Sequence, residues 1–411
     1  MNRQIAVIGG GAAGMAAAIQ AAGVGAAVTV YEKNDRVGKK ILSTGNGRCN
    51  FSNEAMGAAY YHGSGTALLG SVLSAFGVSE TKDFFESLGM RIKDRDGYLY
   101  PASEQASTVL DLLRYELDRR RVTVHTGAAV QALSFDKDRK NFFIGRQGKE
   151  DCYDAVILCC GGKAVPNTGS DGSGFRLAER FGHRIVSPVP ALAALICKES
   201  FYKQVAGVRC DAELTLRTAG KEAARERGEL QLTDYGLSGI PAFQLCRTAA
   251  YALLEKKPVV VRVSFLPDFD EETCGAFFRK RLAAHGEDEM DVFLTGIVNK
   301  KINRLLLKLA GIRETQRAKD VPAETFRRLQ ELYLGLETTV MGTNGFDRAQ
   351  VCAGGVDCNE VTENLMSKKQ PGLYFAGEIL DIDGACGGYN LQWAWSSGTV
   401  AGRAAACGTG I

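Results

Sequence analysis

The stretch that decides the fold is QIAVIGGGAAG, residues 4–14. A short apolar run ends in three consecutive glycines, and an alanine-rich segment follows them as far as residue 22. Apolar strand residues, a glycine break and helix formers in this order predict a strand, a tight turn and a helix. The apolar run at residues 27–32 reads as the next strand, so the N-terminus is expected to form a βαβ unit of a parallel sheet.

The glycines at the turn have the spacing of a dinucleotide-binding loop. Gly9 would allow the tight turn, Gly11 would let a pyrophosphate approach the backbone, and Gly14 would let the helix pack closely on the strand. The helix N-terminus then offers free N–H groups to the phosphates. Glu32 ends the second strand, where a carboxylate can accept hydrogen bonds from a ribose. An acid at this position disfavours a 2′-phosphate, so FAD or NAD is expected over NADP.

A second polar run favours FAD. Residues 38–50, GKKILSTGNGRCN, carry three cations and several hydrogen-bonding side chains. The run is too irregular for a helix, and the whole of residues 34–53 is expected to be a loop. Such a loop suits lying along an extended ligand, and the alternative is a mobile surface loop.

The remaining elements follow from apolar patterning. Helices are expected at about 66–76, 80–88 and 103–120, strands at 122–125 and 154–160, and a hairpin at 129–147. Near Pro188 and Pro190 the sequence pattern changes to that of short strands, which indicates a small β-rich insert. Residues 270–335 then read as helices. Strand–glycine–helix character returns from about 337, so the C-terminus is expected to complete the sheet begun at the N-terminus.

Composition excludes several classes of protein. Fifty Lys+Arg against 47 Asp+Glu give a formal charge of +3, which argues against a dedicated nucleic-acid binder. The twelve cysteines form no C-x-x-C pair, so a zinc or iron–sulfur site is not expected and no metal is predicted. A reduced, cytoplasmic protein fits better than a disulfide framework. Residues 5–28 carry no charge, but their glycine and alanine content and phosphate-loop spacing argue against a membrane span.

The C-terminal segment carries a second set of site features. Residues 371–378 form an apolar strand that ends in glycine and an acid. Gly387 and Gly388 stand where a small-residue helix would begin, so its N–H groups could point at an acceptor such as the pyrimidine edge of a flavin. Trp393 and Trp395 could equally pack this helix into the core or contact a ligand.

These motifs resemble the BaiN/YhiN-like FAD-dependent flavoproteins, the aminoacetone oxidase family. The resemblance covers essentially the whole chain and is most specific in residues 372–402. It implies an α/β fold, a glutathione-reductase-like Rossmann FAD-binding domain with inserted β-barrel and helical subdomains. The implied domains are residues 1–190 plus 337–411 for FAD binding, 191–268 for the barrel-like insert and 269–336 for the helical insert.

The resemblance also implies the cofactor-binding residues. They are Gly9, Gly11, Ala12, Ala13, Gly14, Glu32, Lys33, Lys40, Thr44, Gly45, Asn46, Arg48, Cys49, Asn50, Val130, Cys160, Gly161, Gly377, Glu378, Gly388, Tyr389, Asn390, Leu391 and Gln392. The chain departs from the family at Asn46, where glycine is common, and at Cys159 and Cys160, where Ala-Thr is common. Asn tolerates left-handed backbone better than most residues, so neither change threatens FAD binding.

Three function classes remain open. The first is an FAD-dependent oxidoreductase that transfers hydride between non-covalent flavin and a small or medium apolar substrate, by enone or steroid-like reduction or by amine oxidation. The second is a tRNA-modifying flavoprotein that uses the basic segment between residues 300 and 328, which could also be a solvated helical face. The third is a flavin redox sensor without turnover. The first is favoured, with a small-molecule substrate and neither nucleic acid nor membrane as partner.

The sequence leaves the electron donor and the acid–base group open. There is no second G-x-G-x-x-G after a strand, because residues 169–174 do not fit, and there is no redox cysteine pair. A nicotinamide, NAD(P)H, could donate electrons transiently, or dioxygen could accept them. Candidate catalytic residues are Tyr235 and Arg48, with Tyr389 and Lys40 as further candidates. Tyr235 lies in a glycine-rich run, residues 233–241, that is expected to be a loop reaching toward the flavin, or a plain connection.

Overall fold

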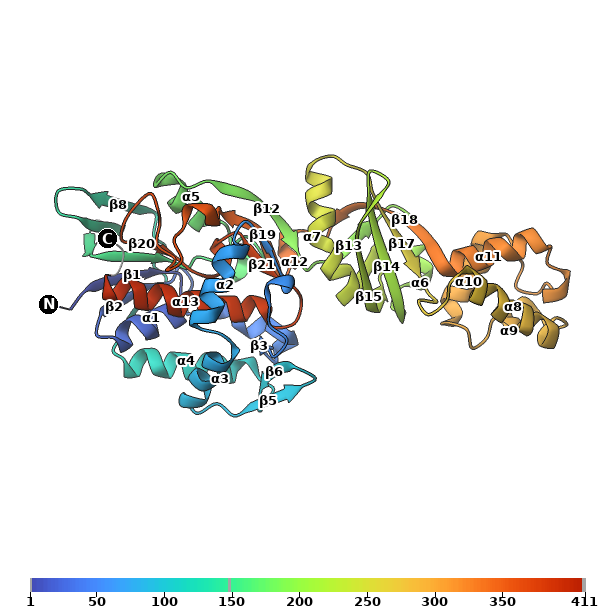
Figure 1. Cartoon of the computed structure of the whole chain (residues 1–411), viewed down its shortest axis with the longest axis horizontal. Helices are drawn as coiled ribbons and strands as arrows, with labels where there is room; N and C mark the ends of the chain where they lie inside the picture. The colour runs from blue at the N-terminus through green and yellow to red at the C-terminus, as the bar shows by residue number, and fades with distance from the viewer. Residues whose placement is uncertain (1, 147–148, 409–411) are drawn as a thin grey trace. The chain divides into compact units, whose positions relative to one another are not determined.

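The computed structural model of the chain describes residues 2–146 and 149–408 (Figure 1). Its contacts divide the chain into two compact units. Unit 1 consists of Met1–Val189 and Gln350–Ile411, and unit 2 consists of Pro190–Ala349.

Unit 1 is built on a parallel sheet of five strands in the order β20-β11-β1-β2-β7. Its strands are β1 Gln4–Ile8, β2 Ala27–Tyr31, β7 Thr123–His125, β11 Ala155–Leu158 and β20 Leu373–Phe375. β1 and β11 lie side by side in the middle of the sheet and are buried almost throughout, as expected for strands covered on both faces. The chain passes from β1 to β2 on one side and enters β11 on the other, so the two strands flank the switch point where such sheets bind ligands.

Helices and smaller sheets surround this sheet. The helices are α1 Ala12–Gly23, α2 Thr66–Ala75, α3 Val78–Ser87, α4 Ala106–Arg119, α5 Ser173–Arg180 and α13 Tyr389–Cys407. The 3₁₀ turns are η1 Lys39–Gly47, η2 Ala58–Tyr60, η3 Pro166–Thr168, η5 Cys358–Glu360 and η6 Gly377–Ile379. The smaller sheets contain β3 Ser52–Asn53, β5 Ile92–Arg95 and β6 Tyr98–Pro101; β4 Tyr61–Gly63 and β21 Ile382–Gly384; β8 Ala132–Asp136, β9 Asn141–Arg146 and β10 Lys149–Tyr153; and β12 Ile185–Ala191 with β19 Val351–Val356.

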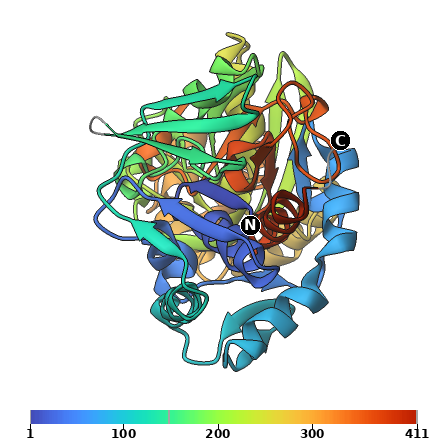
Figure 2. The same cartoon turned by 90° about the vertical axis from the view of Figure 1, so that its left-hand side faces the viewer.

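The first and last helices of unit 1 pack directly on each other. α1 and α13 run side by side in Figures 1 and 2, although they come from opposite ends of the chain. A Cβ on Gly398 would lie 2.4 Å from the Ala13 carbonyl oxygen, and one on Gly402 would lie 2.3 Å from that of Ala17. The two glycines therefore let the backbones approach each other, which fixes the C-terminal helix against the N-terminal loop.

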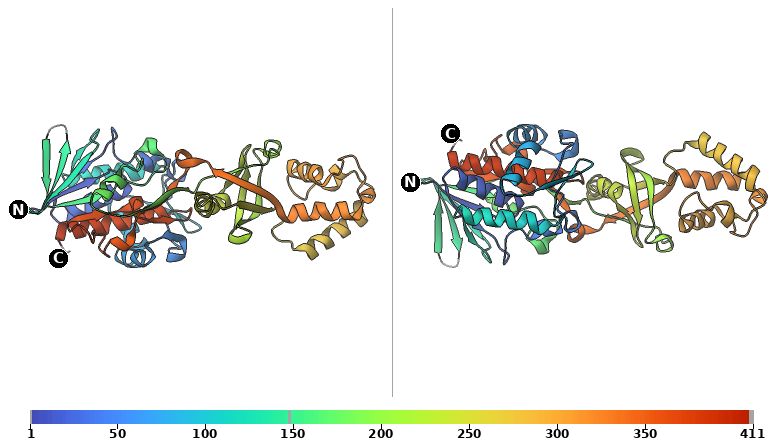
Figure 3. Two further views of the ribbon diagram at one scale, coloured as in Figure 1. Left: turned by 90° about the horizontal axis from the view of Figure 1, so that it is seen from above. Right: turned by 90° about the horizontal axis from the view of Figure 1, so that it is seen from below.

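Unit 2 is a closed six-stranded barrel with attached helices. Its strands are β13 Leu195–Cys197, β14 Arg209–Thr218, β15 Lys221–Leu232, β16 Gly236–Gly239, β17 Val259–Ser264 and β18 Leu336–Thr343. Its helices are α6 Tyr202–Val205, α7 Ile240–Leu254, α8 Glu271–His285, α9 Met290–Phe293, α10 Lys300–Ala310, the 3₁₀ turn η4 Ala318–Asp320, α11 Ala323–Gly335 and α12 Gly345–Arg348. α8, α9, α10 and α11 gather at one end of the barrel (Figures 1 and 3).

The structure corrects several expected boundaries. β18 belongs to the barrel because it pairs with β13 and β17, so the returning part of unit 1 begins at Gln350 and not at residue 337. The expected loop at 34–53 contains the 3₁₀ turn η1, although Thr44, Gly45 and Asn46 break its helical backbone. Residues 236–239 of the expected loop are the strand β16, because they pair with β13 and β15.

The expected hairpin at 129–147 is larger than predicted. β8 and β9 form it, and β10 adds a third antiparallel strand. Residue 147, where the prediction ended, lies outside the described residues. Across the described part of the chain, no helix combines the length and the apolar character that crossing a membrane requires.

Candidate functional site

A cavity of about 540 Å³ opens at the carboxyl ends of the parallel strands in unit 1. Its volume is in the range of small-molecule sites. Gly9 follows β1, Glu32 follows β2, Cys160 follows β11 and Gly377 follows β20, and all four residues line the cavity. Because parallel strands share one carboxyl edge, four separate segments of the sequence meet at this place.

The three loop glycines have different surroundings. Gly9 has a φ of +106°, and a Cβ on it would lie 2.4 Å from the Cys159 carbonyl oxygen. A Cβ on Gly14 would lie 1.9 Å from the Gly9 carbonyl oxygen. Gly11 has a φ of −80°, and a Cβ on it would meet no atom within 4 Å. Gly9 and Gly14 are thus required by the protein's own packing, whereas Gly11 faces open space in the cavity.

The N-terminus of α1 fits a phosphate group. Gly11 precedes the helix, no side chain in the described residues caps it, and Ala12 and Ala13 line the cavity. The first N–H groups of a helix have no partner within the helix and carry its positive dipole end. Open space above Gly11 and uncapped N–H groups beside it are what the pyrophosphate of FAD requires.

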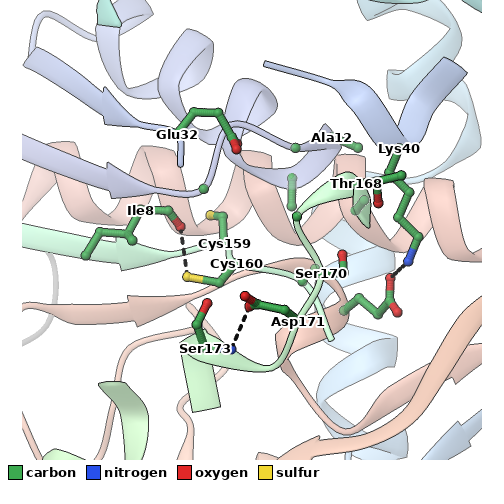
Figure 4. A pocket seen from close by; sticks show the side chains of 18 of the residues that line it. Ile8, Ala12, Glu32, Lys40, Cys159, Cys160, Thr168, Ser170, Asp171 and Ser173 are labelled. Atoms are coloured by element: carbon green, nitrogen blue, oxygen red, sulfur yellow. Dashed lines mark hydrogen bonds and ion pairs between the residues drawn. The ribbon is translucent and has the colours of Figure 1, made fainter. Parts of the chain in front are cut away.

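Glu32 is buried and already holds the loop together. One carboxylate oxygen accepts from the Gly10 N–H at 2.9 Å, and the other accepts from the Asn34 N–H at 2.8 Å and the Asn34 side chain at 2.7 Å. A carboxylate offers about four lone-pair positions, so one remains on the oxygen bound to Gly10. Because Glu32 lines the cavity, that position can accept a hydrogen bond from a ribose hydroxyl (Figure 4).

Lys40 and Glu378 join distant parts of the cavity wall. The Lys40 ammonium lies 2.6 Å from one Glu378 carboxylate oxygen (Figure 4), and the other oxygen accepts from the Cys352 N–H at 2.9 Å. Both charged residues line the cavity and are about one-fifth exposed. The ion pair connects the polar run at residues 38–50 to the strand end at Gly377, so both sides of the site are held in fixed positions.

Sequence reasoning missed one wall of the cavity. Thr168, Ser170, Asp171 and Ser173 line it (Figure 4), and the last three belong to residues 169–174, which do not fit a second dinucleotide loop. Asp171 lies 2.6 Å from the Lys33 ammonium and accepts from the Ser173 N–H at 3.0 Å. Burial would raise the pKa of Asp171, but these two partners outweigh it and lower the pKa to about 2. The signal that could have found this wall is a glycine-rich polar run between a buried strand and a helix.

The adjacent cysteines behave as buried thiols. Cys159 is buried, and Cys160 lines the cavity while its thiol donates to the Ile8 carbonyl oxygen at 3.4 Å (Figure 4). Burial raises the pKa of Cys160 to about 12, so this thiol stays protonated at neutral pH. All twelve cysteines are free.

Most of the expected cofactor-binding residues line the cavity. These are Gly9, Gly11, Ala12, Ala13, Glu32, Lys33, Lys40, Thr44, Val130, Cys160, Gly161, Gly377, Glu378, Asn390 and Leu391. The others lie outside its lining: Gly14, Gly45, Asn46, Arg48, Cys49, Asn50, Gly388, Tyr389 and Gln392.

Two of the expected residues outside the cavity lining have clear structural roles. Asn46 adopts left-handed backbone with a φ of 54°, as its residue type allows. Gln392 is fully buried, and its amide bonds Ser52, Thr81 and Ser396. Trp395 packs in the core and donates to the Phe51 carbonyl oxygen, whereas Trp393 lines the cavity.

The two expected catalytic residues do not line the cavity. Tyr235 belongs to unit 2, immediately before β16, and its hydroxyl accepts from the Asn344 side chain at 3.3 Å. Arg48 follows η1 in unit 1 and is exposed. Catalytic roles for both residues stay predictions.

Comparison with known proteins places the whole chain in one family. Residues 3–404 match the model of the HI0933-like protein Rossmann domain. The chain is 46% identical over 409 residues to a 3-dehydro-bile acid delta(4,6)-reductase of Clostridium scindens, covering 99% of each chain. It is 29% identical to a ribosomal RNA dihydrouridine synthase of Escherichia coli, covering 95% of each.

A solved structure shares the fold. The 3-ketosteroid-delta4-(5alpha)-dehydrogenase of Rhodococcus jostii matches with a TM-score of 0.50 and 15% identity, covering 98% of this chain and 97% of that one. The expected Rossmann architecture with a barrel insert is therefore confirmed. The family match, the reductase relative and the open, uncapped N-terminus of α1 agree with the expectation from the sequence. The chain belongs to the HI0933-like Rossmann family and is an FAD-dependent oxidoreductase.

Proposed function

We propose that the protein binds FAD non-covalently and reduces a carbon–carbon double bond conjugated to a carbonyl group in an apolar, steroid-like substrate. The observation that carries the proposal is the 46% identity, over 99% of each chain, to a bile acid reductase. Near-complete coverage means that both units have counterparts in that relative. The cavity supports the cofactor part of the proposal, because open space over Gly11 adjoins uncapped helix N–H groups.

Different residues of unit 1 bind different parts of FAD in this proposal. The N-terminus of α1 holds the pyrophosphate, and the remaining lone pair of Glu32 accepts from the ribose. The ion pair of Lys40 and Glu378 joins two parts of the cavity wall. FAD supplies the two-electron chemistry when it is bound. Because the cavity walls come from several elements, the protein's contribution is to position the flavin.

The electron donor and the compartment are part of the proposal. We infer that NAD(P)H donates electrons transiently, since the described residues contain no second dinucleotide loop. Twelve free thiols fit a reducing, cytoplasmic compartment.

Anaerobic stopped-flow spectroscopy tests the function. Heat denaturation of the yellow protein should first release free FAD. Photoreduced protein mixed with a 3-oxo-Δ4,6 steroid should regain oxidised-flavin absorbance, whereas the saturated 3-oxo steroid should leave it reduced. Oxidised protein mixed with amines should stay oxidised. Flavin reduction by amines without reoxidation by the enone would overturn the proposal in favour of an amine oxidase.

RNA is a second candidate substrate, favoured by the dihydrouridine synthase names of two relatives. The basic segment between residues 300 and 328 gives it limited support. Lys300 and Arg304 pair with Asp291, and Arg317 and Lys319 pair with Glu287. These cations are partly neutralised by neighbouring acids, as on a solvated helical face. Salt-dependent retention of purified RNA would favour this candidate, and retention that does not depend on salt or is absent would remove it.

Tyr235 remains our proposed contributor from unit 2. We propose that its hydroxyl orients the substrate or donates a proton. Tyr235→Phe should lower the rate of enone-dependent flavin reoxidation while leaving FAD content and melting temperature unchanged. An unchanged rate would remove Tyr235 from proton transfer.

A further inference from the structure

Three tyrosines from separate elements of unit 1 gather around one loop. Tyr60 ends η2, Tyr98 begins β6 and Tyr389 begins α13. The Tyr60 and Tyr389 rings are stacked, with centroids 4.6 Å apart and planes inclined by 16°. A Cβ on Gly387 would lie 2.8 Å from the Tyr98 ring and 3.3 Å from the Tyr389 ring. All three rings therefore meet at residues 384–388, the loop before α13.

Hydrogen bonds fix this arrangement. The Tyr61 hydroxyl donates to the Tyr389 carbonyl oxygen at 2.8 Å, and the Ala385 N–H donates to the Tyr60 carbonyl oxygen at 2.8 Å. β21, which ends at Gly384, pairs with β4, which begins at Tyr61. The rings are thus placed by backbone contacts between segments more than 300 residues apart in the sequence, and two of them project from that fixed base.

The exposure of the three rings differs sharply. Tyr389 is 5% exposed, whereas Tyr60 and Tyr98 are each 40% exposed. Burial raises the pKa of Tyr389 to about 12, and the nearby Tyr60 and Tyr98 hydroxyls add to the effect. The Tyr389 hydroxyl is therefore protonated at neutral pH and is engaged with Tyr60, so the two partly exposed rings, Tyr60 and Tyr98, are the ones that a ligand can reach.

The three tyrosines lie outside the cavity lining but adjoin it through the first turn of α13. Asn390 and Leu391 follow Tyr389 in the first turn of α13, and both line the cavity. The Asn390 side chain bonds both the N–H and the carbonyl oxygen of Gly384 at 2.8 Å. The loop that carries the tyrosines and the helix turn that borders the cavity are therefore one rigid piece.

We propose that Tyr60 and Tyr98 bind the substrate, their rings against its flat hydrocarbon face and their hydroxyls on its conjugated carbonyl oxygen, while the buried Tyr389 holds Tyr60 in place by ring stacking. This inference rests on the proposed function. Reduction of an enone adds hydride, from reduced FAD, to the β-carbon, and the electron pair of the double bond moves toward the carbonyl oxygen. The tyrosine hydroxyls donate hydrogen bonds to that oxygen as its negative charge develops. The α-carbon then takes a proton from water, which completes the two-electron reduction.

Single hydroxyl deletions test the inference on FAD-loaded protein. Tyr60→Phe and Tyr98→Phe keep the rings and remove the donors, and Tyr115→Phe on α4, a ring that is 70% exposed, is the matched control. Two quantities are measured. The first is the dissociation constant of a 3-oxo-Δ4 steroid by equilibrium dialysis against oxidised protein. The second is the rate at which a 3-oxo-Δ4,6 steroid reoxidises photoreduced protein.

Each deletion should weaken steroid binding several-fold and slow reoxidation by about tenfold or more, since a donor to a developing charge is worth more than one to a neutral oxygen. FAD content should match the control. The role of the tyrosines would be overturned if the enone reoxidised the wild-type protein but the rates of Tyr60→Phe and Tyr98→Phe equalled that of Tyr115→Phe. No reoxidation of the wild-type protein by the enone would instead overturn the proposed function itself, so the two failures are distinct.

Discussion

Glu32 and His183 are both buried polar residues of unit 1, yet only one belongs to an open site. Glu32 accepts three hydrogen bonds and borders the cavity. His183 lies 2.7 Å from the Ser367 hydroxyl through one ring nitrogen and 3.1 Å from Glu360 through the other. Serine, histidine and a carboxylate in this order have the hydrogen-bond connectivity of a nucleophilic triad.

Access separates the two networks. Ser367 is only 1% exposed, and its hydroxyl oxygen accepts from the N–H groups of Lys369 and Gln370. Its own hydrogen is therefore directed to His183, which in turn donates to Glu360. This network is closed and joins the start of β12 to residues 360–370. A free lone pair that faces a cavity, as on Glu32, therefore marks a binding site better than the hydrogen-bond connectivity of a triad does.

The largest expected effect comes from filling the open space above Gly11. Gly11→Val should abolish FAD binding, because the new side chain would occupy the pyrophosphate position. The backbone at Gly11 suits any residue, and the protein places no atom near the new Cβ. The melting temperature of the apoprotein should therefore stay unchanged, as measured by calorimetry beside the flavin content. Full FAD occupancy in the variant would refute the assignment of the loop.

The matched control for that variant is Gly14→Ala. A single methyl group there would overlap the Gly9 carbonyl oxygen. The control should lower the melting temperature of the apoprotein, in contrast to Gly11→Val. If both variants lost FAD with equal loss of stability, the distinction between packing glycines and the ligand-facing glycine would fail.

Glu32→Gln should have the next largest effect. The amide keeps the size of the side chain but loses its charge and one of its two acceptor oxygens. Hydrogen bonds to a charged group contribute about 1.5–3 kcal/mol, so the dissociation constant of FAD should rise about ten- to 150-fold. Titration of apoprotein with FAD measures this change. Glu32→Ala should in addition lower stability, because the N–H groups of Gly10 and Asn34 lose their acceptor. Unchanged FAD affinity in both variants would place the ribose elsewhere.

The sequence predicts the part of the site whose residues lie close together in the chain. Gly9, Gly11 and Gly14 stand within one turn and are followed by Glu32 at the end of the next strand, so spacing alone conveys the geometry. The βαβ unit and the buried strand of β11 have the same local character. The resemblance to a family added Lys40 and Glu378, whose ion pair joins residues far apart in the sequence.

The parts that escaped prediction depend on long-range pairing. Leu336–Thr343 has few large apolar residues, and only its pairing with β13 and β17 makes it the closing strand of the barrel. Asp171 joins the cavity wall through Lys33, which is 138 positions earlier in the sequence. Tyr60 and Tyr98 meet Tyr389 only in the folded chain. The hydrophobic periodicity of the sequence predicts none of these contacts.

Ser367→Ala probes the closed network and should affect stability alone. The substitution leaves the His183 ring nitrogen and the Lys369 N–H without their partner, which costs about 1–3 kcal/mol for buried groups. The melting temperature should fall by several degrees, while FAD content and enone-dependent reoxidation stay at wild-type values. A large fall in turnover at normal FAD content would show that the network acts in catalysis and that closure is a poor criterion.

The smallest expected effect is the pH dependence that His183 gives to the fold. Burial, helped by the positive charge of Lys369, lowers the pKa of His183 below its ordinary value of 6.5, against the opposite effect of Glu360. The unfolded chain therefore binds a proton more readily than the folded one does, and the free energy of unfolding falls as pH drops below about 6.5. The slope for one such group is at most about 1.4 kcal/mol per pH unit. His183→Gln should be less stable than wild type at pH 8 but lose less stability between pH 7 and pH 5.5, as urea unfolding at each pH would measure. Equal slopes would mean that His183 is not the group whose neutrality the closed network requires, since Gln cannot titrate in that range.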